Sequence, residues 1–246
     1  MEISVIASGS NGNCCLVEEK DVSILIDAGK SCREIEKRMN SMGKSLENVN
    51  ALLITHSHYD HCSSVGIVSK RYGLPIYLMK DVHSLIDDKV SEAEKRFISP
   101  GKSFTVKGVE IRPVATSHNV PSCGFVIGGF GLFTDTGIVT REMEAMFPKL
   151  RCALLESNHD IDMLINGAYP AFLKQLILSD RGHLSNVHAS KFIQEKGQNL
   201  SHVLLGHLSG NNNTPKAARA AFETLVKRKI DCHICSRESI SGSWVI

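Results

Sequence analysis

The feature of the sequence that most constrains the fold is the segment Ala51-Leu-Leu-Ile-Thr-His-Ser-His-Tyr-Asp-His61. Its first four residues are apolar and predict a short buried strand. Three histidines and an aspartate follow within a few residues, namely His56, His58, Asp60 and His61. A strand that ends in a tight loop can direct the alternate side chains of His56 and His58 toward one metal position. The next pair, Asp60 and His61, can then face a second metal position. Imidazole and carboxylate groups so arranged predict a hydrolytic site with two metal ions about 3.5–4 Å apart.

A polar loop that is rich in histidine by chance is the alternative interpretation, and we would prefer it for a lone histidine. For four metal-capable side chains in one short segment we favour a metal site. The segment Thr55-His-Ser-His-Tyr-Asp-His61 also resembles the T-H-x-H-x-D-H motif of the metallo-β-lactamase superfamily. One position departs from the pattern, because Ser64 stands where many members have glycine, with Gly66 nearby. Serine is small, so we expect only a local adjustment.

The resemblance implies an α/β (α+β) fold, the metallo-β-lactamase-like αβ/βα four-layer sandwich of two β-sheets flanked by helices. The order of predicted elements agrees with it, since strands dominate first and strands then alternate with helices. No repeat of fixed period and no low-complexity linker interrupts the chain. We therefore expect residues 1–246 to form a single domain of this fold.

The composition excludes other classes of protein. A chain of 246 residues with 42% hydrophobic and 22% charged residues can bury a full core. The N-terminal segment does not have the pattern of a signal peptide, and no run of 18 apolar residues predicts a membrane span. The eight cysteines are therefore expected to be reduced, and the predicted location is cytoplasmic. A net charge of +2 means that a nucleic acid would have to bind a local basic face.

Three further metal-capable residues each follow an apolar run, namely His118, Asp135 and His207. A ligand at a strand end is rigid because the sheet fixes its direction. Each residue alone is a weak signal, but in this order they resemble the later metal motifs of the superfamily. The resemblance implies two divalent ions per chain, with the native metal left open among Zn, Mn and Fe. One ion would have His56, His58 and His118 as ligands, the other Asp60, His61 and His207, and Asp135 would bridge them.

Three segments indicate a branch of the superfamily, namely Leu155-Glu-Ser-Asn-His-Asp160, Ser179-Asp-Arg-Gly-His-Leu-Ser-Asn186 and Gly206-His-Leu-Ser-Gly-Asn-Asn-Asn-Thr-Pro215. Together they resemble the YycJ/WalJ group of bacterial proteins, which is related to ribonuclease Z and to phosphodiesterases of the phosphonate pathway. This resemblance implies a phosphodiesterase or nuclease that acts on DNA rather than RNA, in the manner of a 5′-to-3′ exonuclease.

Gly182-His183-Leu-Ser resembles a ribonuclease Z segment whose histidine is thought to protonate the leaving oxygen, and Glu156 resembles the glutamate that accompanies it. A histidine that is poised by a carboxylate is a suitable general acid near neutral pH. The alternative is that His183 only caps the helix that begins near Ser185, and we favour the acid. The expected mechanism is attack on phosphorus by a metal-activated hydroxide that Asp60 orients.

Four other polar residues are weaker candidates for substrate binding. His159 is interpreted equally well as a phosphate contact and as an ordinary polar loop residue. Ser209, Asn211 and Asn213 are small or polar and are candidates for lining the phosphate path.

Two other functions compete with the nuclease. The first is a small-molecule metallo-hydrolase for a cyclic phosphodiester, thioester or lactone, and the nuclease-like segments at Glu156 and His183 argue against it. The second is a non-catalytic regulatory protein, which the intact ligand set disfavours. The sequence does not decide whether the substrate is DNA or RNA, or from which end it is cleaved. It also leaves the oligomeric state open, and a homodimer is one possibility. No membrane partner is expected.

Overall fold

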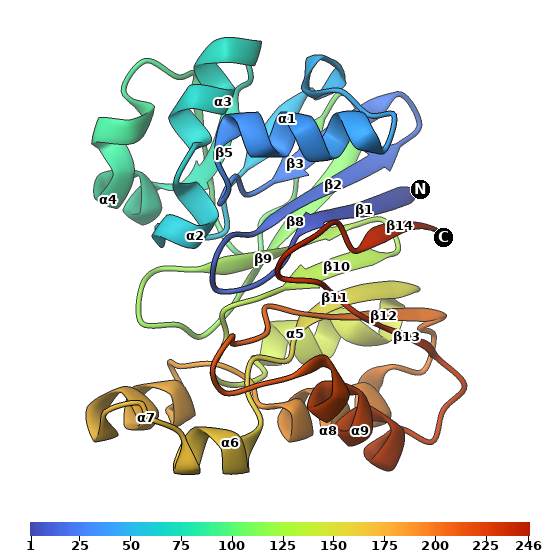
Figure 1. The fold of residues 1–246 in the computed structure, drawn as a ribbon. Helices are drawn as coiled ribbons and strands as arrows, with labels where there is room; N and C mark the ends of the chain where they lie inside the picture. The colour runs from blue at the N-terminus through green and yellow to red at the C-terminus, as the bar shows by residue number, and fades with distance from the viewer. The chain divides into compact units, whose positions relative to one another are not determined.

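The computed structural model describes residues 1–246, which fold into two compact units (Figure 1). The first unit comprises Met1–Pro113 together with Ser236–Ile246, and the second comprises Val114–Cys235. Each unit has a β-sheet with helices packed against it. That residues 1–246 behave as a single domain stays a prediction.

The sheet of the first unit has the strand order β14-β1-β2-β3-β4-β5-β6. The strands are β1 (Glu2–Ala7), β2 (Cys14–Glu19), β3 (Val22–Ile26), β4 (Ala51–Leu53), β5 (Ile76–Met79), β6 (Lys95–Ile98) and β14 (Gly242–Val245). The pairs β14–β1, β1–β2 and β2–β3 are antiparallel, whereas the pairs β3–β4, β4–β5 and β5–β6 are parallel. All three residues of β4 are fully buried, as expected for a parallel strand that is covered on both faces. Because β14 pairs with β1, the two chain ends lie together (Figure 1).

The first unit carries the helices α1 (Cys32–Ser41), α2 (Tyr59–Cys62), α3 (Val65–Tyr72) and α4 (Lys80–Val90), and a 3-10 turn at Leu46–Asn48. Ser31 caps α1 as predicted, since its hydroxyl accepts a hydrogen bond from the amide of Glu34 at 3.3 Å. Gly66 lets α3 approach α4 closely, because a Cβ there would lie 1.7 Å from the carbonyl oxygen of Lys89. Ser31 therefore determines where α1 begins, and Gly66 allows the close approach of α3 and α4.

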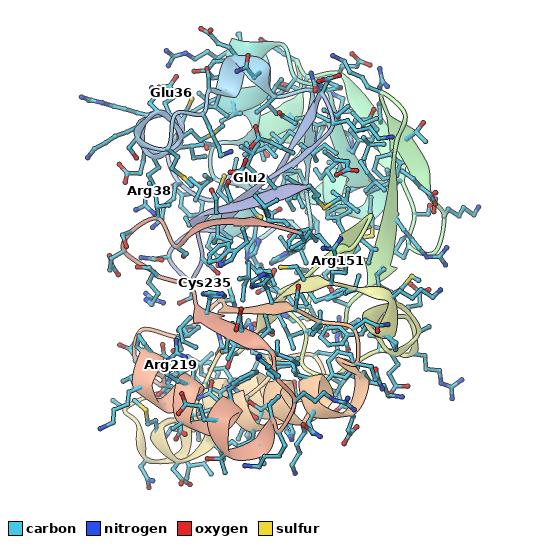
Figure 2. All side chains as sticks on the ribbon, turned by 90° about the vertical axis from the view of Figure 1, so that its right-hand side faces the viewer. Glu2, Glu36, Arg38, Arg151, Arg219 and Cys235 are labelled. Carbon is cyan, nitrogen blue, oxygen red and sulfur yellow. The ribbon has the colours of Figure 1, made fainter.

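A buried arginine ties α1 to the rest of the first unit (Figure 2). The guanidinium of Arg38 donates to the carbonyl oxygens of Ile6 and Glu238, each at 2.9 Å. It also donates to the carboxylate of Glu34 at 2.8 Å. An arginine is retained in such a position only when its donors are paired, because an unpaired buried charge is costly. The C-terminal segment is thus joined to β1 through one side chain.

The second seven-stranded sheet has the strand order β13-β12-β11-β10-β9-β8-β7, and all of its strands except β7 and most of β8 belong to the second unit. Its strands are β7 (Phe104–Val106), β8 (Val109–Ala115), β9 (Cys123–Ile127), β10 (Phe130–Phe133), β11 (Cys152–Glu156), β12 (His202–Gly206) and β13 (Asp231–Ile234). The strands β10 to β13 are parallel, so their carboxyl ends meet at one edge. This edge is where the polar residues of the second unit gather.

The helices of the second unit are α5 (Arg141–Met146), α6 (Ile161–Asn166), α7 (Ala171–Leu178), α8 (Asn186–Lys196) and α9 (Pro215–Leu225), with a 3-10 turn at Phe147–Lys149. Figure 1 shows α5, α8 and α9 on the same face of the sheet. Phe147 and Phe192 pack with ring centroids 4.2 Å apart, and Phe133, Leu155 and Leu205 share their core. Burying a side chain of this size stabilises the fold by about 1.5–3 kcal/mol. None of the helices is both long and apolar enough to cross a membrane.

The strand and helix pattern of the sequence differs from the structure mainly at sheet edges. The apolar pattern predicts Val203–Leu205 as the last buried strand, but β13 and β14 follow it. Neither strand has a fully buried residue, so alternation of apolar and polar residues does not identify them. The helix predicted from Thr214 to Lys229 ends at Leu225. There the chain turns away, and the amide of Lys227 donates to Gln194 on α8 at 2.8 Å.

Candidate functional site

The histidine-rich segment of the first unit forms the turn between β4 and α2. His56 and His58 lie in the loop, and Asp60 and His61 lie on α2. The ring centroids of His56 and His58 are 4.7 Å apart, and those of His56 and His61 are 4.2 Å apart. The Nε2 atom of His61 lies 3.6 Å from a carboxylate oxygen of Asp60. The structure therefore brings these polar side chains together within the first unit, and their role as metal ligands stays a prediction.

Asp27, which follows β3, fixes the orientation of this loop. Its carboxylate accepts hydrogen bonds from Nδ1 of His61 at 2.7 Å and from the amide and hydroxyl of Thr55, each at 2.9 Å. Because Nδ1 of His61 donates to a carboxylate, Nε2 keeps its lone pair. Asn13 Nδ2 lies 2.9 Å from Nε2, in keeping with a lone pair there. A metal ligand needs this arrangement of the imidazole ring.

The backbone around α2 is held by close contacts with the loop after β3. A Cβ on Gly29 would lie 1.7 Å from the carbonyl oxygen of Asp60, so only glycine fits there. The hydroxyl of Ser64 donates to the carbonyl oxygens of Ala28 at 3.1 Å and Lys30 at 2.5 Å. Ser64 is 3% exposed, and its hydroxyl is fully used in this contact. The serine that departs from the family pattern is therefore accommodated locally, as expected.

In the second unit the predicted ligands lie at strand ends. Asp135 comes just after β10, His207 just after β12, and His118 in the loop after β8. Asp135 and His207 have φ values of 57° and 55°, a left-handed conformation that turns the chain sharply at the end of the strand. One carboxylate oxygen of Asp135 lies 3.7 Å from Nε2 of His118 and 3.6 Å from Nε2 of His207. The carboxylate thus lies between two imidazoles.

Glu156, the last residue of β11, connects the two histidines His183 and His207. Its Oε1 atom accepts hydrogen bonds from Nδ1 of His183 at 2.7 Å and from Nδ1 of His207 at 2.9 Å. Its Oε2 atom accepts from the amides of Thr136 at 3.0 Å and Leu184 at 3.1 Å. Glu156 is fully buried, and four hydrogen bonds satisfy its carboxylate. It therefore orients both imidazoles, with Nε2 of His207 facing Asp135.

The charges of this cluster shift the pKa values in opposite directions. Burial by itself raises the pKa of Glu156, but the charge of His183 and the hydrogen bonds from both histidines outweigh it and lower the pKa to about 2. Burial by itself lowers the pKa of His183, but Glu156 and then Asp135 outweigh it and raise the pKa above its ordinary value. At neutral pH Glu156 is ionised, and His183 holds a proton more readily than a free imidazole does.

The loop that carries His183 is bound to His118. Nδ1 of His118 donates to the carbonyl oxygen of Gly182 at 3.1 Å, and Arg181 donates to the carbonyl oxygen of His118 at 3.0 Å. A Cβ on Gly182 would lie 2.2 Å from the carbonyl oxygens of both Leu176 and Ile177, so the tight turn after α7 requires glycine. The helix α8 is capped by Ser185, not by His183. The alternative role of His183 as a helix cap is therefore wrong.

The donor groups of the second unit fit a divalent metal ion. Ligand atoms of Asp135 and His207 lie within 4.8 Å of the Glu156–His183 pair, whose hydrogen bonds leave Asp135 and His207 as the ligands of this group. Buried imidazole nitrogens and carboxylate oxygens are ligands that Zn, Mn and Fe accept. His118 and His207 each donate from Nδ1 to an oxygen, so Nε2 is the atom that each presents to a metal.

The weaker substrate-binding candidates have different surroundings. The Ser209 hydroxyl accepts from the amide of Asn211 at 3.4 Å, and the side chain of Asn211 donates to Tyr169 at 3.0 Å. The side-chain amide of Asn213 is buried and donates to the backbone carbonyl oxygens of Ser157 and Asn158. Asn213 thus joins two loops, and substrate binding by Ser209, Asn211 or Asn213 stays a prediction.

His159 follows β11, three residues after Glu156, and makes no side-chain hydrogen bond. It is 1% exposed, and neither ring nitrogen has a hydrogen-bond partner. Its backbone carbonyl accepts from the amide of Asn186 at 2.9 Å, so the residue is held firmly in place. A role of His159 as a phosphate contact stays a prediction.

Sequence reasoning missed two residues that support the metal loop. Asp27 follows the apolar strand Val22–Ile26, which is the same signal that identified Asp135. Nothing in the sequence around Asn13 distinguishes it from an ordinary turn residue. Its role follows only from the position of its side chain against His61.

This chain is similar to known proteins of one superfamily. The family model described as beta-lactamase superfamily domain matches residues 23–207. Exodeoxyribonuclease WalJ of Streptococcus pneumoniae (strain D39) is 34% identical over 226 residues, covering 87% of this chain and 84% of the relative. Exodeoxyribonuclease YycJ of Bacillus anthracis is 30% identical over 238 residues, covering 93% and 90%.

A solved structure confirms the fold class. The metallo-β-lactamase fold protein YhfI of Bacillus subtilis matches 99% of this chain and 98% of its own, with a TM-score of 0.75 and 19% identity. The predicted fold class, with two β-sheets flanked by helices, is therefore confirmed. The family model covers most of the chain, and the WalJ and YycJ matches extend over nearly all of it. The chain thus belongs to the beta-lactamase superfamily and, within it, to the group that includes the WalJ and YycJ exodeoxyribonucleases.

Proposed function

We propose that this protein is a metal-dependent hydrolase of phosphodiesters that acts on DNA as an exonuclease. The observation that carries the proposal is the Glu156–His183 pair, which lies beside the predicted ligands Asp135 and His207. A proton donor near the metal site suits the hydrolysis of a phosphodiester, because the leaving oxygen has to be protonated. The metal ligands by themselves do not show which kind of hydrolase the protein is. The names of the WalJ and YycJ relatives support DNA as the substrate.

Two divalent ions, Zn, Mn or Fe, fit the donor groups. When bound, such ions supply an activated water and neutralise the charge of the phosphate. The proposed ligands are His56, His58 and His118 for one ion, and Asp60, His61 and His207 for the other, with Asp135 between them. The proposed ligand set is supported within each unit, because Asp27 orients His61 in the first unit and Glu156 orients His207 in the second.

His183 is the proposed general acid. Its Nδ1 is held by Glu156 at 2.7 Å, so the proton on Nε2 is the one that it transfers to the leaving oxygen. The ionised Glu156 stabilises the doubly protonated imidazole before transfer. Asp60 is proposed to orient the attacking water. A 5′-to-3′ polarity, a cytoplasmic location and a homodimer remain predictions, and sedimentation of the purified protein tests the last of these.

The test is cleavage of end-labelled DNA and RNA, single- and double-stranded, by protein loaded with Mn or Zn. We expect metal-dependent release of nucleotides from one end of DNA, abolished in Asp60→Ala. The label that is lost first reports the polarity. If no polymer is cleaved while a cyclic phosphodiester, thioester or lactone is, the protein is a small-molecule hydrolase. If metal binds but nothing is cleaved, the non-catalytic alternative is supported.

A further inference from the structure

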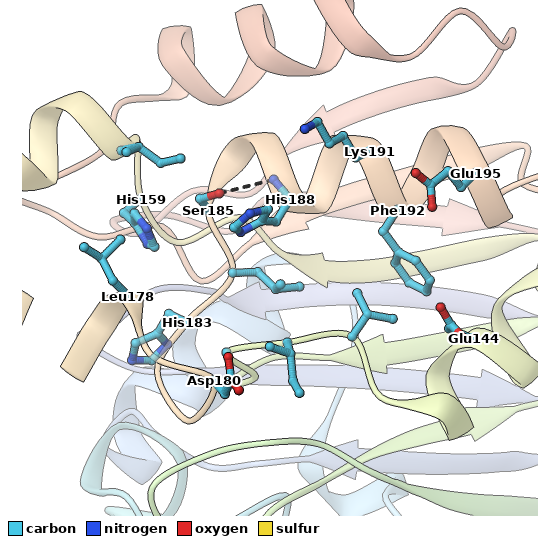
Figure 3. Close-up of a pocket in the computed structure, with 15 residues that line it drawn as sticks. Glu144, His159, Leu178, Asp180, His183, Ser185, His188, Lys191, Phe192 and Glu195 are labelled. Carbon is cyan, nitrogen blue, oxygen red and sulfur yellow. Dashed lines mark hydrogen bonds between the residues drawn. The ribbon is translucent and has the colours of Figure 1, made fainter. Parts of the chain in front are cut away.

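The second unit contains a cavity of about 290 Å³ that His183 lines (Figure 3). This volume is just below about 300 Å³, at which the usual range for small-molecule sites begins. Figure 3 shows His159, Leu178 and His183 at one end of the cavity. His183 therefore lies between the cavity and the carboxylate of Glu156, to which its Nδ1 is bound. Any group in this cavity lies next to the proposed proton donor.

Part of the lining is apolar and open to solvent. Ile138 is 41% exposed and Leu178 is 48% exposed, although both are large apolar residues. The other large apolar residues of the lining are Val139, Ile161, Leu184 and Phe192, and Phe192 also packs in the core. Exposed apolar side chains beside a catalytic residue are expected where a ligand covers them. These side chains suit a group that is at least partly apolar.

His159 provides a polar group inside the cavity with no partner in the protein. Both ring nitrogens are buried without a hydrogen bond. Burial lowers the pKa of His159 to about 4, so the ring is neutral at neutral pH and offers one donor and one acceptor. A buried polar group is normally hydrogen-bonded, so a polar group that enters the cavity can supply the partner that His159 lacks in the protein. The polar edge of a nucleobase has such groups.

The charges on the cavity argue against a phosphate as the occupant. Glu144, Asp180 and Glu195 contribute carboxylates to the lining, whereas Lys191 contributes one ammonium group. This excess of carboxylates repels an anion at short range. The neutral ring of His159 adds no positive charge that would offset these carboxylates. A neutral ring is therefore favoured over a phosphate.

We propose that this cavity binds the base of the 5′-terminal nucleotide of DNA. The inference rests on the proposed function. In the reaction, the water oxygen bonds to phosphorus, the bond from phosphorus to the 3′-oxygen of the terminal nucleotide breaks, and that oxygen takes the proton of His183. The base attached to the leaving sugar then lies next to His183, where the cavity is. The apolar side chains of the cavity contact the terminal base, and His159 offers it a hydrogen bond.

The main test compares DNA with a normal 5′-terminal nucleotide and DNA with an abasic tetrahydrofuran residue there. Stacking of one base on a protein surface predicts a kcat/KM about 5- to 150-fold higher for the normal end. In Leu178→Ala this ratio is expected to fall to a few-fold. Leu176→Ala is the matched control, since Leu176 lies on the same helix, is 40% exposed and does not line the cavity. It should retain the wild-type ratio.

A second measurement does not depend on catalysis. DNA with 5-iodouracil at the 5′ end is irradiated on the protein, and the crosslinked peptides are mapped. Crosslinks to the segments that contain Ile138, His159 or Leu178 support the cavity, and crosslinks only elsewhere overturn it. DNA cleavage at equal rates with and without the terminal base would also overturn the inference while leaving the exonuclease intact. Absence of DNA cleavage together with no crosslink in the cavity would reject both.

Discussion

The orientation of His61 by Asp27 makes the substitution Asp27→Asn a sharp test of the metal loop. The carboxylate of Asp27 accepts from Nδ1 of His61 at 2.7 Å and from Thr55. An asparagine can still accept from Thr55 through its carbonyl oxygen, but it then presents its NH2 group to His61. The imidazole must accept at Nδ1 and carry its proton on Nε2, the atom that a metal needs.

The magnitude follows from this change of tautomer. Loss of a partner that orients a metal-binding histidine weakens metal binding about 10- to 100-fold, or about 1.4–2.7 kcal/mol. Asp27→Ala would instead leave the donors of Thr55 and His61 buried and unpaired, at a further cost of about 1–3 kcal/mol each. The asparagine variant therefore separates metal affinity from stability.

The assay is competition for Zn against a chromophoric chelator at pH 7.5, with metal content measured by mass spectrometry. Circular dichroism checks that the variant is folded. Asp21→Asn is the matched control, since Asp21 lies in the exposed turn before β3 and should bind metal as the wild type does. A folded Asp27→Asn protein with wild-type affinity for both ions would refute the reasoning.

Three further predictions concern the second unit and the cysteines. His183→Gln should lower kcat on DNA about 10²- to 10⁴-fold with unchanged metal content, whereas His202→Gln should not, and single-turnover kinetics with metal analysis checks both. The folded-state pKa of His159, about 4, lies below the ordinary 6.5, so the unfolded chain takes up the proton first as the pH falls. Stability should therefore fall by about 3 kcal/mol between pH 6.5 and 4, and urea denaturation of chelator-treated protein should show a smaller fall in His159→Gln. Burial raises the pKa of Cys152 and Cys232 to about 12, so these thiols should react with Ellman's reagent only after denaturation, and a fast reaction of either in the native protein would contradict the structure.

The local features of this protein were predictable from its sequence because they depend on neighbours along the chain. The cap at Ser31 and the buried strand at Ala51–Leu53 each follow from a few adjacent residues. The metal motif is also local, since its polar side chains span a single turn and one short helix. The resemblance to the superfamily was therefore available from motifs alone.

The tertiary structure decided which residues orient the site. Asp27 reaches Thr55 and His61 because β3 pairs in parallel with β4, and Glu156 reaches both His183 and His207 because β11 pairs with β12. These partners are far apart in sequence, and their meeting depends on the order of strands in a sheet. The same is true of the cavity at His159, whose lining comes from several helices and loops. Periodicity reports what one segment buries, whereas the pairing of distant segments follows from the packing of the whole sheet.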